Sequence, residues 1–493
     1  MNATSWLALA FSSSLLAASS DCRSCHAAIV EAFSKTGMGR SLAVRPAAFT
    51  VEFYHRISNR HYTFAGGKLK RHQLDAAGRE INVVEKTVDL AIGSGNHAIT
   101  YVNRTPQGRL IELPVSWYSQ AKAYFMSPGY DAPDHPDMRR EVGESCLFCH
   151  SDSAKPAAIT CQRCHGDSAA HLAKPARDTI HNPKQSIEVC LQCHLETVSQ
   201  GITDSIRQPG RAVFSYKPGE PLANYKLYFD RAEPTPEARF EVNHAGFRLM
   251  QSACFKRSAG KLTCVTCHDP HTAQARNACG TCHQSEHTRE NPNGCATCHM
   301  PKRQTQDAIH VSMTDHWIQR QPRVAKPAKE DHSPYTGAVV PFYTKADALT
   351  LAVANGRAPS EESAKLLAAY SRRAPGDVPT LVALGKTLVQ LNRPSQAEPR
   401  LRQAVSQDPM HSGARVALGV ALARQGKLRE ALAVFEAATA SNPDDAFAWL
   451  NLGATHRELK QLEKAAAAYR EAIRLQPDLT AARSGLAAVV AER

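Results

Sequence analysis

Residues 261–272 read KLTCVTCHDPHT, and our interpretation of the whole chain depends on the pattern in this stretch. Two residues separate Cys264 from Cys267, and His268 follows at once. Such a pattern serves a redox dithiol, part of a zinc site or the attachment of a c-type haem. His271 stands three residues after His268, too near to bind the opposite face of the same centre with ease.

The Cys-x-x-Cys-His pattern occurs seven times in the 493 residues and uses fourteen of the fifteen cysteines. A zinc site takes four ligands, usually from two cysteine pairs, and seven pairs cannot be shared out two by two. A redox dithiol would be a single motif in a thioredoxin-like unit. Haem attachment explains every motif, because two thiols bind the porphyrin edge and the next imidazole binds the iron. We therefore expect seven c-type haems, each with one iron.

Each motif supplies two cysteines that attach a haem and one histidine that binds its iron. The cysteines are Cys22, Cys25, Cys146, Cys149, Cys161, Cys164, Cys190, Cys193, Cys264, Cys267, Cys279, Cys282, Cys295 and Cys298. The proximal histidines are His26, His150, His165, His194, His268, His283 and His299.

The N-terminal residues 1–20 form a short apolar stretch that ends in small residues, which predicts a signal peptide. No Lys or Arg precedes this stretch, so the start of a buried helix is the alternative. Covalent haem attachment takes place outside the cytoplasm, and we expect a periplasmic or otherwise exported protein. No apolar run of 18 or more residues predicts a membrane span.

The formal net charge of +13 does not indicate nucleic-acid binding in this chain. Seven haems bring roughly fourteen propionate groups, which ionise in the usual carboxyl range. We expect much of the Lys and Arg to pair with these propionates.

Fifteen of the 22 histidines lie outside the motifs, more than enough for a second ligand on every haem. His271 follows the proximal His268 too closely to reach round its own haem, so we expect it to bind a neighbouring one. His171 follows His165 by six residues, and we expect the same of it.

Several segments resemble the multihaem cytochromes of the cytochrome c-554 and nitrite-reductase-related group, in the form fused to tetratricopeptide repeats. These segments read CQRCHGDSAAH, LTCVTCHDPH, CATCHMPKR, HVSMTDHWI, GSGNHAITYV and LIELPVSWY. The resemblance implies closely stacked haems that pass electrons, mostly with histidine on both faces. The distal ligands that it implies are His97, His171, His244, His271, His310 and His316. The seventh place stays open between His61 and His287.

Members of the wider group that reduce nitrite keep one open haem, held by the lysine of a Cys-x-x-Cys-Lys motif. All seven motifs here end in histidine, which favours an electron carrier over an enzyme. A haem that lacks its distal ligand is also open, so an enzyme stays an alternative. Cys254, the one cysteine outside the motifs, is either a small buried residue or a candidate catalytic group beside an open haem.

Residues of about 48–130 alternate between apolar and polar side chains, with turn signals between the runs, which predicts a β-rich insertion. We expect it to cover the first haem or to supply ligands to it; a substrate-binding domain is the alternative. Residues 317–341 are rich in Pro, Lys and Arg and are interpreted as a linker.

From residue 342 to residue 493 the chain repeats with a period of 34 residues and has no cysteine. The period relates four prolines, the three Leu-Gly pairs that end at Gly385, Gly419 and Gly453, and the large residues Leu401, Phe435 and Tyr469. This period is typical of tetratricopeptide repeats. We expect three full repeats, a degenerate one before them and a capping helix after them. Such stacks usually bind a peptide or protein; a rigid spacer or self-association surface is the alternative.

The sequence therefore predicts a multidomain protein. A mostly α-helical haem domain with little regular structure, at residues 21–316, carries the β-rich insertion, and an α-solenoid follows at residues 342–493. We expect an exported carrier of electrons, whose repeats dock a redox partner that can also tie it to a membrane. The alternatives are a reductase of a small nitrogen or sulfur oxyanion at one open haem, and a self-associating conductive polymer subunit.

Overall fold

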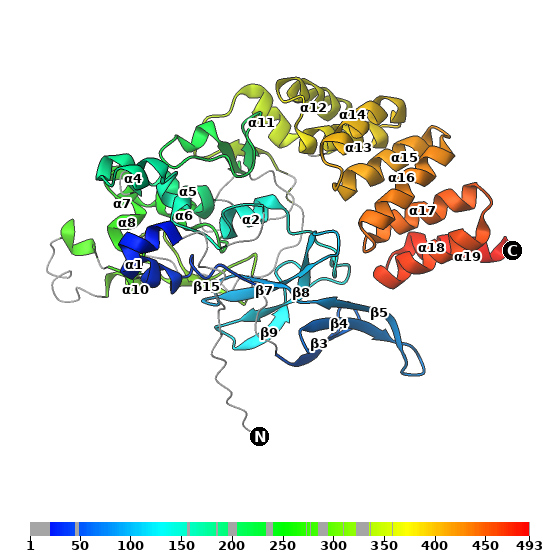
Figure 1. Cartoon of the computed structure of the whole chain (residues 1–493), viewed down its shortest axis with the longest axis horizontal. Coiled ribbons are helices and arrows are strands. Elements are labelled where there is room, and N and C mark those ends of the chain that lie inside the picture. Colours follow the sequence, from blue (N-terminus) through cyan, green and yellow to red (C-terminus); the bar gives the residue numbers. More distant parts are fainter. Residues whose placement is uncertain are drawn as a thin grey trace.

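The computed structural model describes residues 20–44, 49–154, 158–183, 186–195, 205–232, 240–272, 274–276, 278–283, 294–308, 310–321, 335, 337–356 and 358–492. Within these ranges the chain has three parts: short helices that carry the cysteine motifs, a β-rich part and a row of longer helices (Figure 1). Residues 1–19 of the predicted signal peptide and residues 322–334 of the predicted linker lie outside the described residues.

The cysteine motifs lie on or beside short helical segments. Most of these segments are far shorter than the ~12 residues that an isolated helix needs in water, so packing must hold them in place. The segments are α1 (Ser20–Ser34), α2 (Glu144–His150), α3 (Gln162–His165), α4 (Ala169–Ala173), η2 (Arg177–Thr179), α5 (Glu188–His194), η4 (Leu222–Asn224), α6 (Ala245–Gln251), α7 (Ala253–Arg257), α8 (Cys264–Cys267), η5 (Cys279–Thr281) and α10 (Cys295–His299).

Three small antiparallel sheets tie these helices together. Their strands are β10 (Ser205–Arg207), β11 (Lys226–Arg231), β12 (His268–Asp269), β13 (Gln274–Ala275), β14 (Lys302–Gln304), β15 (Ser312–Thr314) and β16 (Val339–Pro341). Because β16 pairs with β11, the last residues of the predicted linker belong to a sheet of the motif-bearing part.

The predicted β-rich insertion is confirmed as two antiparallel sheets, with strand orders β1-β6-β7-β8-β9 and β2-β3-β4-β5. The strands are β1 (Leu42–Val44), β2 (Val51–His55), β3 (Arg60–Ala65), β4 (Lys68–Leu74), β5 (Glu80–Thr87), β6 (Leu90–Ile92), β7 (Ala98–Arg104), β8 (Leu110–Tyr118) and β9 (Ala123–Met126). The expected turn joins β7 to β8, with Gly108 at a φ of 83° that favours glycine. Tyr62 and Phe64 of one sheet share an apolar core with Leu113 and Val115 of the other.

The C-terminal helices form antiparallel pairs, as the period of 34 residues predicts (Figure 1). They are α11 (Ala348–Asn355), α12 (Glu361–Arg373), α13 (Val378–Gln390), α14 (Pro394–Gln407), α15 (Ser412–Arg424), α16 (Leu428–Ser441), α17 (Ala446–Glu458), α18 (Leu462–Leu475) and α19 (Thr480–Ala491). A Cβ at Gly419 would lie 2.5 Å from the Phe435 ring, so glycine lets the two helices of this repeat approach. Among the described helices, none has the length and apolar character of a membrane span.

Both ends of this row of helices contact the rest of the chain. At the N-terminal end, the Tyr343 hydroxyl donates a hydrogen bond of 2.7 Å to Glu188 Oε1, at the start of α5. At the C-terminal end, Ala446 and Leu475 join the apolar core of the β-rich part. The row therefore spans from the motif-bearing helices to the β-rich part.

Candidate functional site

The structure describes all fifteen cysteines and joins none of them in a disulfide. Some motifs that are distant in the sequence lie close together. A hydrogen bond from the Cys264 thiol lowers the pKa of Cys190, so the fourth and fifth motifs are neighbours. The sixth and seventh motifs are also neighbours, because the Cys295 thiol adds to the effect of burial in raising the pKa of Cys279. Two pairs of motifs are thus neighbours, the fourth with the fifth and the sixth with the seventh.

Three motif histidines lie opposite histidines that we expected as distal ligands. The ring centres are 6.4 Å apart for His26 and His171, 6.1 Å for His165 and His271, and 6.0 Å for His268 and His316. The angles between the ring planes are 16°, 15° and 33°. The sequence pointed to His171, His271 and His316, but it did not assign a motif to any of them.

The spacing of these pairs suits a metal between two imidazoles. Metal–nitrogen bonds of about 2.0–2.1 Å on both sides, with each ring centre roughly 1 Å behind its nitrogen, separate the centres by roughly 6 Å. Direct stacking is closer: the ring centres of Phe125 and His310 are 3.9 Å apart. A haem iron needs only one or two protein ligands, because the porphyrin supplies the other four. A pair of opposed imidazoles is therefore the arrangement that fits haem.

Hydrogen bonds leave the second ring nitrogen of several of these histidines available. Nδ1 of His165 lies 3.0 Å from the His181 carbonyl oxygen, and Nδ1 of His316 lies 3.1 Å from that of Thr314. Nδ1 of His171 is 3.1 Å from the Ala176 carbonyl oxygen. When Nδ1 donates to a carbonyl, the Nε2 lone pair can bind a metal, as metal-binding histidines commonly do.

Burial also favours the neutral imidazole, which is the form that binds metals. Removal from water disfavours the charged ring and lowers the pKa of His165, His268 and His316. The same effect lowers the pKa of His150 to about 4. Among the described residues, no group of three or more His, Cys, Asp or Glu side chains is arranged to hold a bare metal ion.

The remaining expected ligands have other surroundings. His310 stacks on Phe125, and His244 lies against Phe247 with its Nε2 3.4 Å from Glu241 Oε2. His97 is half-buried, and burial lowers its pKa, with Lys302 adding to the effect. The role of these three histidines as ligands stays a prediction.

The two histidines left open for the seventh place also differ. His61 lies on β3 in the β-rich part, stacked between Tyr54 and His72 with ring centres 4.5 and 5.0 Å away. His287 lies outside the described residues. Cys254 lies on α7 close enough to Cys279 for its thiol to contribute to the raised pKa of that residue.

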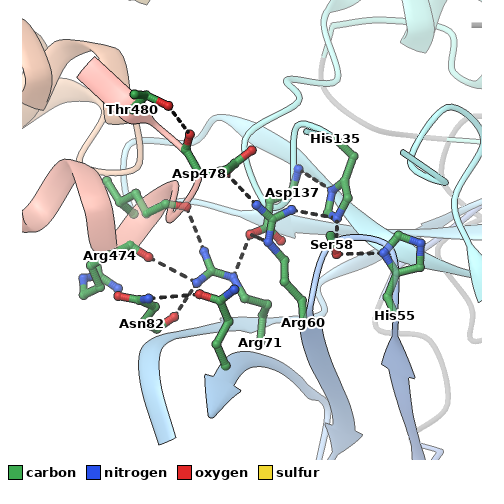
Figure 2. Close-up of polar contacts among 12 residues, drawn as sticks. His55, Ser58, Arg60, Arg71, Asn82, His135, Asp137, Arg474, Asp478 and Thr480 are labelled. Atoms are coloured by element: carbon green, nitrogen blue, oxygen red, sulfur yellow. Dashed lines mark hydrogen bonds and ion pairs between the residues drawn. The ribbon is translucent and has the colours of Figure 1, made fainter. Parts of the chain in front are cut away.

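A cluster of buried charges that the sequence did not reveal joins the β-rich part to the last repeat (Figure 2). Asp137, 1 % exposed, lies 2.7 Å from Nε of Arg71 and 3.7 Å from Nε of Arg60. Arg60 also pairs with Asp478 at 2.9 Å, while Arg71 donates to the backbone carbonyls of Arg474 and Leu475. The cluster holds the end of α18 and the turn that leads into α19 against β3 and β4.

A fourth buried side chain of the cluster, His135, accepts a hydrogen bond of 2.8 Å from Nη1 of Arg60. Burial and the adjacent Arg60 charge lower the pKa of His135 to about 3. Burial would raise the pKa of Asp137, but the charges of Arg71 and Arg60 outweigh it and lower that pKa. The cluster therefore contains a carboxylate and a neutral imidazole near pH 7.

The comparisons with known proteins bear on the C-terminal helices. Residues 382–438 and 421–480 match the family model described as Tetratricopeptide repeat. These helices are tetratricopeptide repeats. No match was found among curated proteins.

Solved structures similar to this chain include YrrB, a TPR protein with an unusual peptide-binding site. It is 31% identical over 28% of this chain and 73% of its own, with a TM-score of 0.26. MamA from Desulfovibrio magneticus RS-1 is 27% identical over 27% of this chain and 75% of its own, with a TM-score of 0.26. The first TPR of Spaghetti (RPAP3), bound to an HSP90 peptide, is 21% identical over 23% of this chain and 91% of its own, with a TM-score of 0.23.

Proposed function

We propose that the chain is an exported multihaem c-type cytochrome, in which seven covalently held haems carry electrons and the repeats dock a protein partner. One observation carries the proposal: three motif histidines each lie 6.0–6.4 Å, between ring centres, from a histidine expected as a distal ligand. A haem iron supplies one-electron transfer between its ferric and ferrous states. In the three paired sites, two imidazoles would hold the iron in place and keep other ligands away.

The three pairs follow one another along the chain, which supports a row of sites. His171 follows His165 by six residues, and His271 follows His268 by three. The segment with the proximal His165 of the third motif therefore supplies His171 to the first motif. In the same way, the segment with the proximal His268 of the fifth motif supplies His271 to the third motif. This favours an order in space in which the first, third and fifth motifs are neighbours.

The haem content and an electron paramagnetic resonance spectrum of the oxidised protein test the proposal. We expect about seven covalent haems per chain and low-spin ferric signals from the paired sites. Replacing His171 or His271 by Ala should each open one haem, seen as a new high-spin signal. Replacing His411 by Ala is the matched control, because its Nδ1 accepts a hydrogen bond from Ala414 within the repeats. A protein without covalent haem would refute the proposal.

The same spectrum separates the carrier from the reductase. A high-spin signal of about one haem in the unaltered protein would indicate an open iron and would favour reduction of a small nitrogen or sulfur oxyanion. The proximity of Cys254 to Cys279 makes the sixth motif the first place to look. Low-spin signals alone would support the carrier.

Docking of a partner by the repeats requires a test that leaves the repeats in place. A deletion of residues 342–493 would also remove Ala446 and Leu475 from the core of the β-rich part. Exposed residues on the first helices of two repeats, Lys386 and Phe447, are better targets. We expect Lys386→Glu with Phe447→Ala to weaken capture of the redox partner from a periplasmic extract and to leave the haem spectrum unchanged. Equal capture of the partner by the variant and by the unaltered chain would contradict docking at these helices. Light scattering of the unaltered chain tests the alternative of a self-associating polymer.

A further inference from the structure

We propose that a buried arginine–carboxylate clamp, made of Arg248, Asp315 and Arg303, positions His316 opposite His268. Nε of Arg248 donates to Oδ1 of Asp315 at 2.8 Å, and Nη2 donates to Oδ2 at 2.5 Å. Nη1 of Arg303 donates to the same Oδ2 at 3.0 Å. The inference rests on the proposed function, because the role of His316 as an iron ligand does.

The clamp acts on the residue that directly precedes His316. Oδ1 of Asp315 also accepts the backbone N–H of Trp317 at 3.0 Å, so one carboxylate fixes the backbone on both sides of the histidine. The Arg248 guanidinium lies over the Trp317 ring, 5.0 Å from its centre. These contacts leave the peptide around His316 little freedom to turn.

Further hydrogen bonds hold the same short segment to the end of α6. Ser252, at the end of α6, donates from its hydroxyl to the His316 carbonyl at 3.1 Å and accepts the N–H of Ile318 at 2.8 Å. Strand β14 pairs with β15, and β15 ends two residues before His316. The segment is thus held by α6 and β14, the two elements that carry the arginines.

The burial of the charges argues for a positioning role. The side chain of Arg248 is 0% exposed and that of Asp315 is 5% exposed. A buried ion pair often adds little net stability compared with apolar side chains of similar volume, because both charges lose their water. Two-point bonding between a guanidinium and a carboxylate does fix their geometry closely. An imidazole that must meet an iron at one place needs this kind of support.

The same segment also reaches the seventh motif. The backbone N–H of Gln319 donates to the His299 carbonyl at 3.2 Å, and Nδ1 of His299 lies 2.8 Å from the Gln319 carbonyl oxygen. The segment that the clamp holds, residues 315–319, therefore orients two histidines. His316 is the distal histidine of the fifth motif, and His299 is the proximal histidine of the seventh.

The test uses the full haem-loaded chain and four variants: Asp315→Ala, Asp315→Asn, His316→Ala and the double change of Asp315→Ala with His316→Ala. Asp444→Ala is the matched control, because it removes another poorly exposed ion pair, with Lys86, in the interface with the repeats. The readouts are the high-spin ferric signal, binding of carbon monoxide to the reduced protein, and amide exchange of residues 312–318.

We expect His316→Ala to open about one haem per chain, which added imidazole closes again. Asp315→Ala should produce the same high-spin signal, and the double change should add nothing to His316→Ala. Loss of the charged hydrogen bonds, each worth about 1.5–3 kcal/mol, should speed amide exchange around His316 roughly 10- to 150-fold. Asp444→Ala should change none of these readouts.

Asp315→Asn keeps the shape of the side chain but removes its charge. If Asp315→Ala does not fold, the same readouts of Asp315→Asn test the positioning role. The inference is overturned if His316→Ala opens a haem while the foldable Asp315 variants keep every haem low-spin and bind no carbon monoxide. A failure of the proposed function is a different result: no covalent haem in the unaltered chain, or no opened haem in His316→Ala.

Discussion

Replacing Asp137 by Ala should loosen the attachment of the last repeat to the β-rich part. The side chains of Arg60 and Arg71 are each 1% exposed, and Asp137 is the carboxylate that both of them share (Figure 2). Removing one partner of a buried ion pair costs about 3–5 kcal/mol, because the remaining charge stays out of water. We expect a loss of this size in the free energy that opens the interface.

Hydrogen–deuterium exchange followed by mass spectrometry measures this opening. A loss of about 3–5 kcal/mol corresponds to roughly 10²- to 10⁴-fold faster exchange in peptides that cover β3, β4 and the end of α18. Asp478→Ala is the control, since its side chain is 35% exposed and its pairing with Arg60 is screened by water. That variant should lose no more than about 1 kcal/mol. Less than tenfold faster exchange in Asp137→Ala, or equal effects of both variants, would refute the reasoning.

Two further predictions concern pH and helix packing. The pKa of His135 is lowered to about 3 in the folded chain. Below pH ~6.5 the unfolded chain therefore binds a proton that the folded chain does not. As the pH falls from ~6.5 to about 3, the free energy of unfolding should decrease by up to about 1.4 kcal/mol per pH unit. His135→Gln should remove that slope from urea titrations at pH 7 and pH 5, and an unchanged slope would contradict the assignment. Gly419→Ala should destabilise the repeats by roughly 1–3 kcal/mol, because its Cβ would lie 2.5 Å from Phe435; a higher melting temperature by circular dichroism would show that helix propensity prevails.

The repeats were predictable because their contacts are local and periodic. A small residue at Gly385, Gly419 or Gly453 meets Leu401, Phe435 or Tyr469 of the next helix, always sixteen residues further on. The hairpin of β7 and β8 was predictable for a similar reason: alternation fixes the buried face, and the turn between the strands has residues that suit it. The same reasoning predicted three full repeats, a degenerate repeat before them and a capping helix after them. The structure has three helix pairs from α13 to α18, with α11 and α12 before them and α19 after them.

The pairing of the histidines was not predictable, because no period links the partners. His26 and His171 are brought together by the fold of the intervening β-rich part and motif helices. The sequence predicted that His171 binds a haem other than that of its own motif, but not which one. The contact of Arg60 with Asp478 spans 418 residues and was missed completely. In the sequence both residues look like ordinary surface charges. Only the structure shows that Arg60 is buried and that Asp478 lies against it.

The two anchored ends of the repeats constrain how the proposed docking of a partner would serve the proposed electron transfer. At one end the contact is with Glu188, the first residue of the helix that carries the fourth motif. At the other end the buried charges around Asp137 fix the last helices to the β-rich part. A solenoid free at either end would let a bound partner swing away from the motifs. In the proposed carrier, a solenoid held at both ends would keep the partner at a fixed position relative to the motifs. Weakening either anchor should then slow electron transfer from a docked partner without changing the haem spectrum.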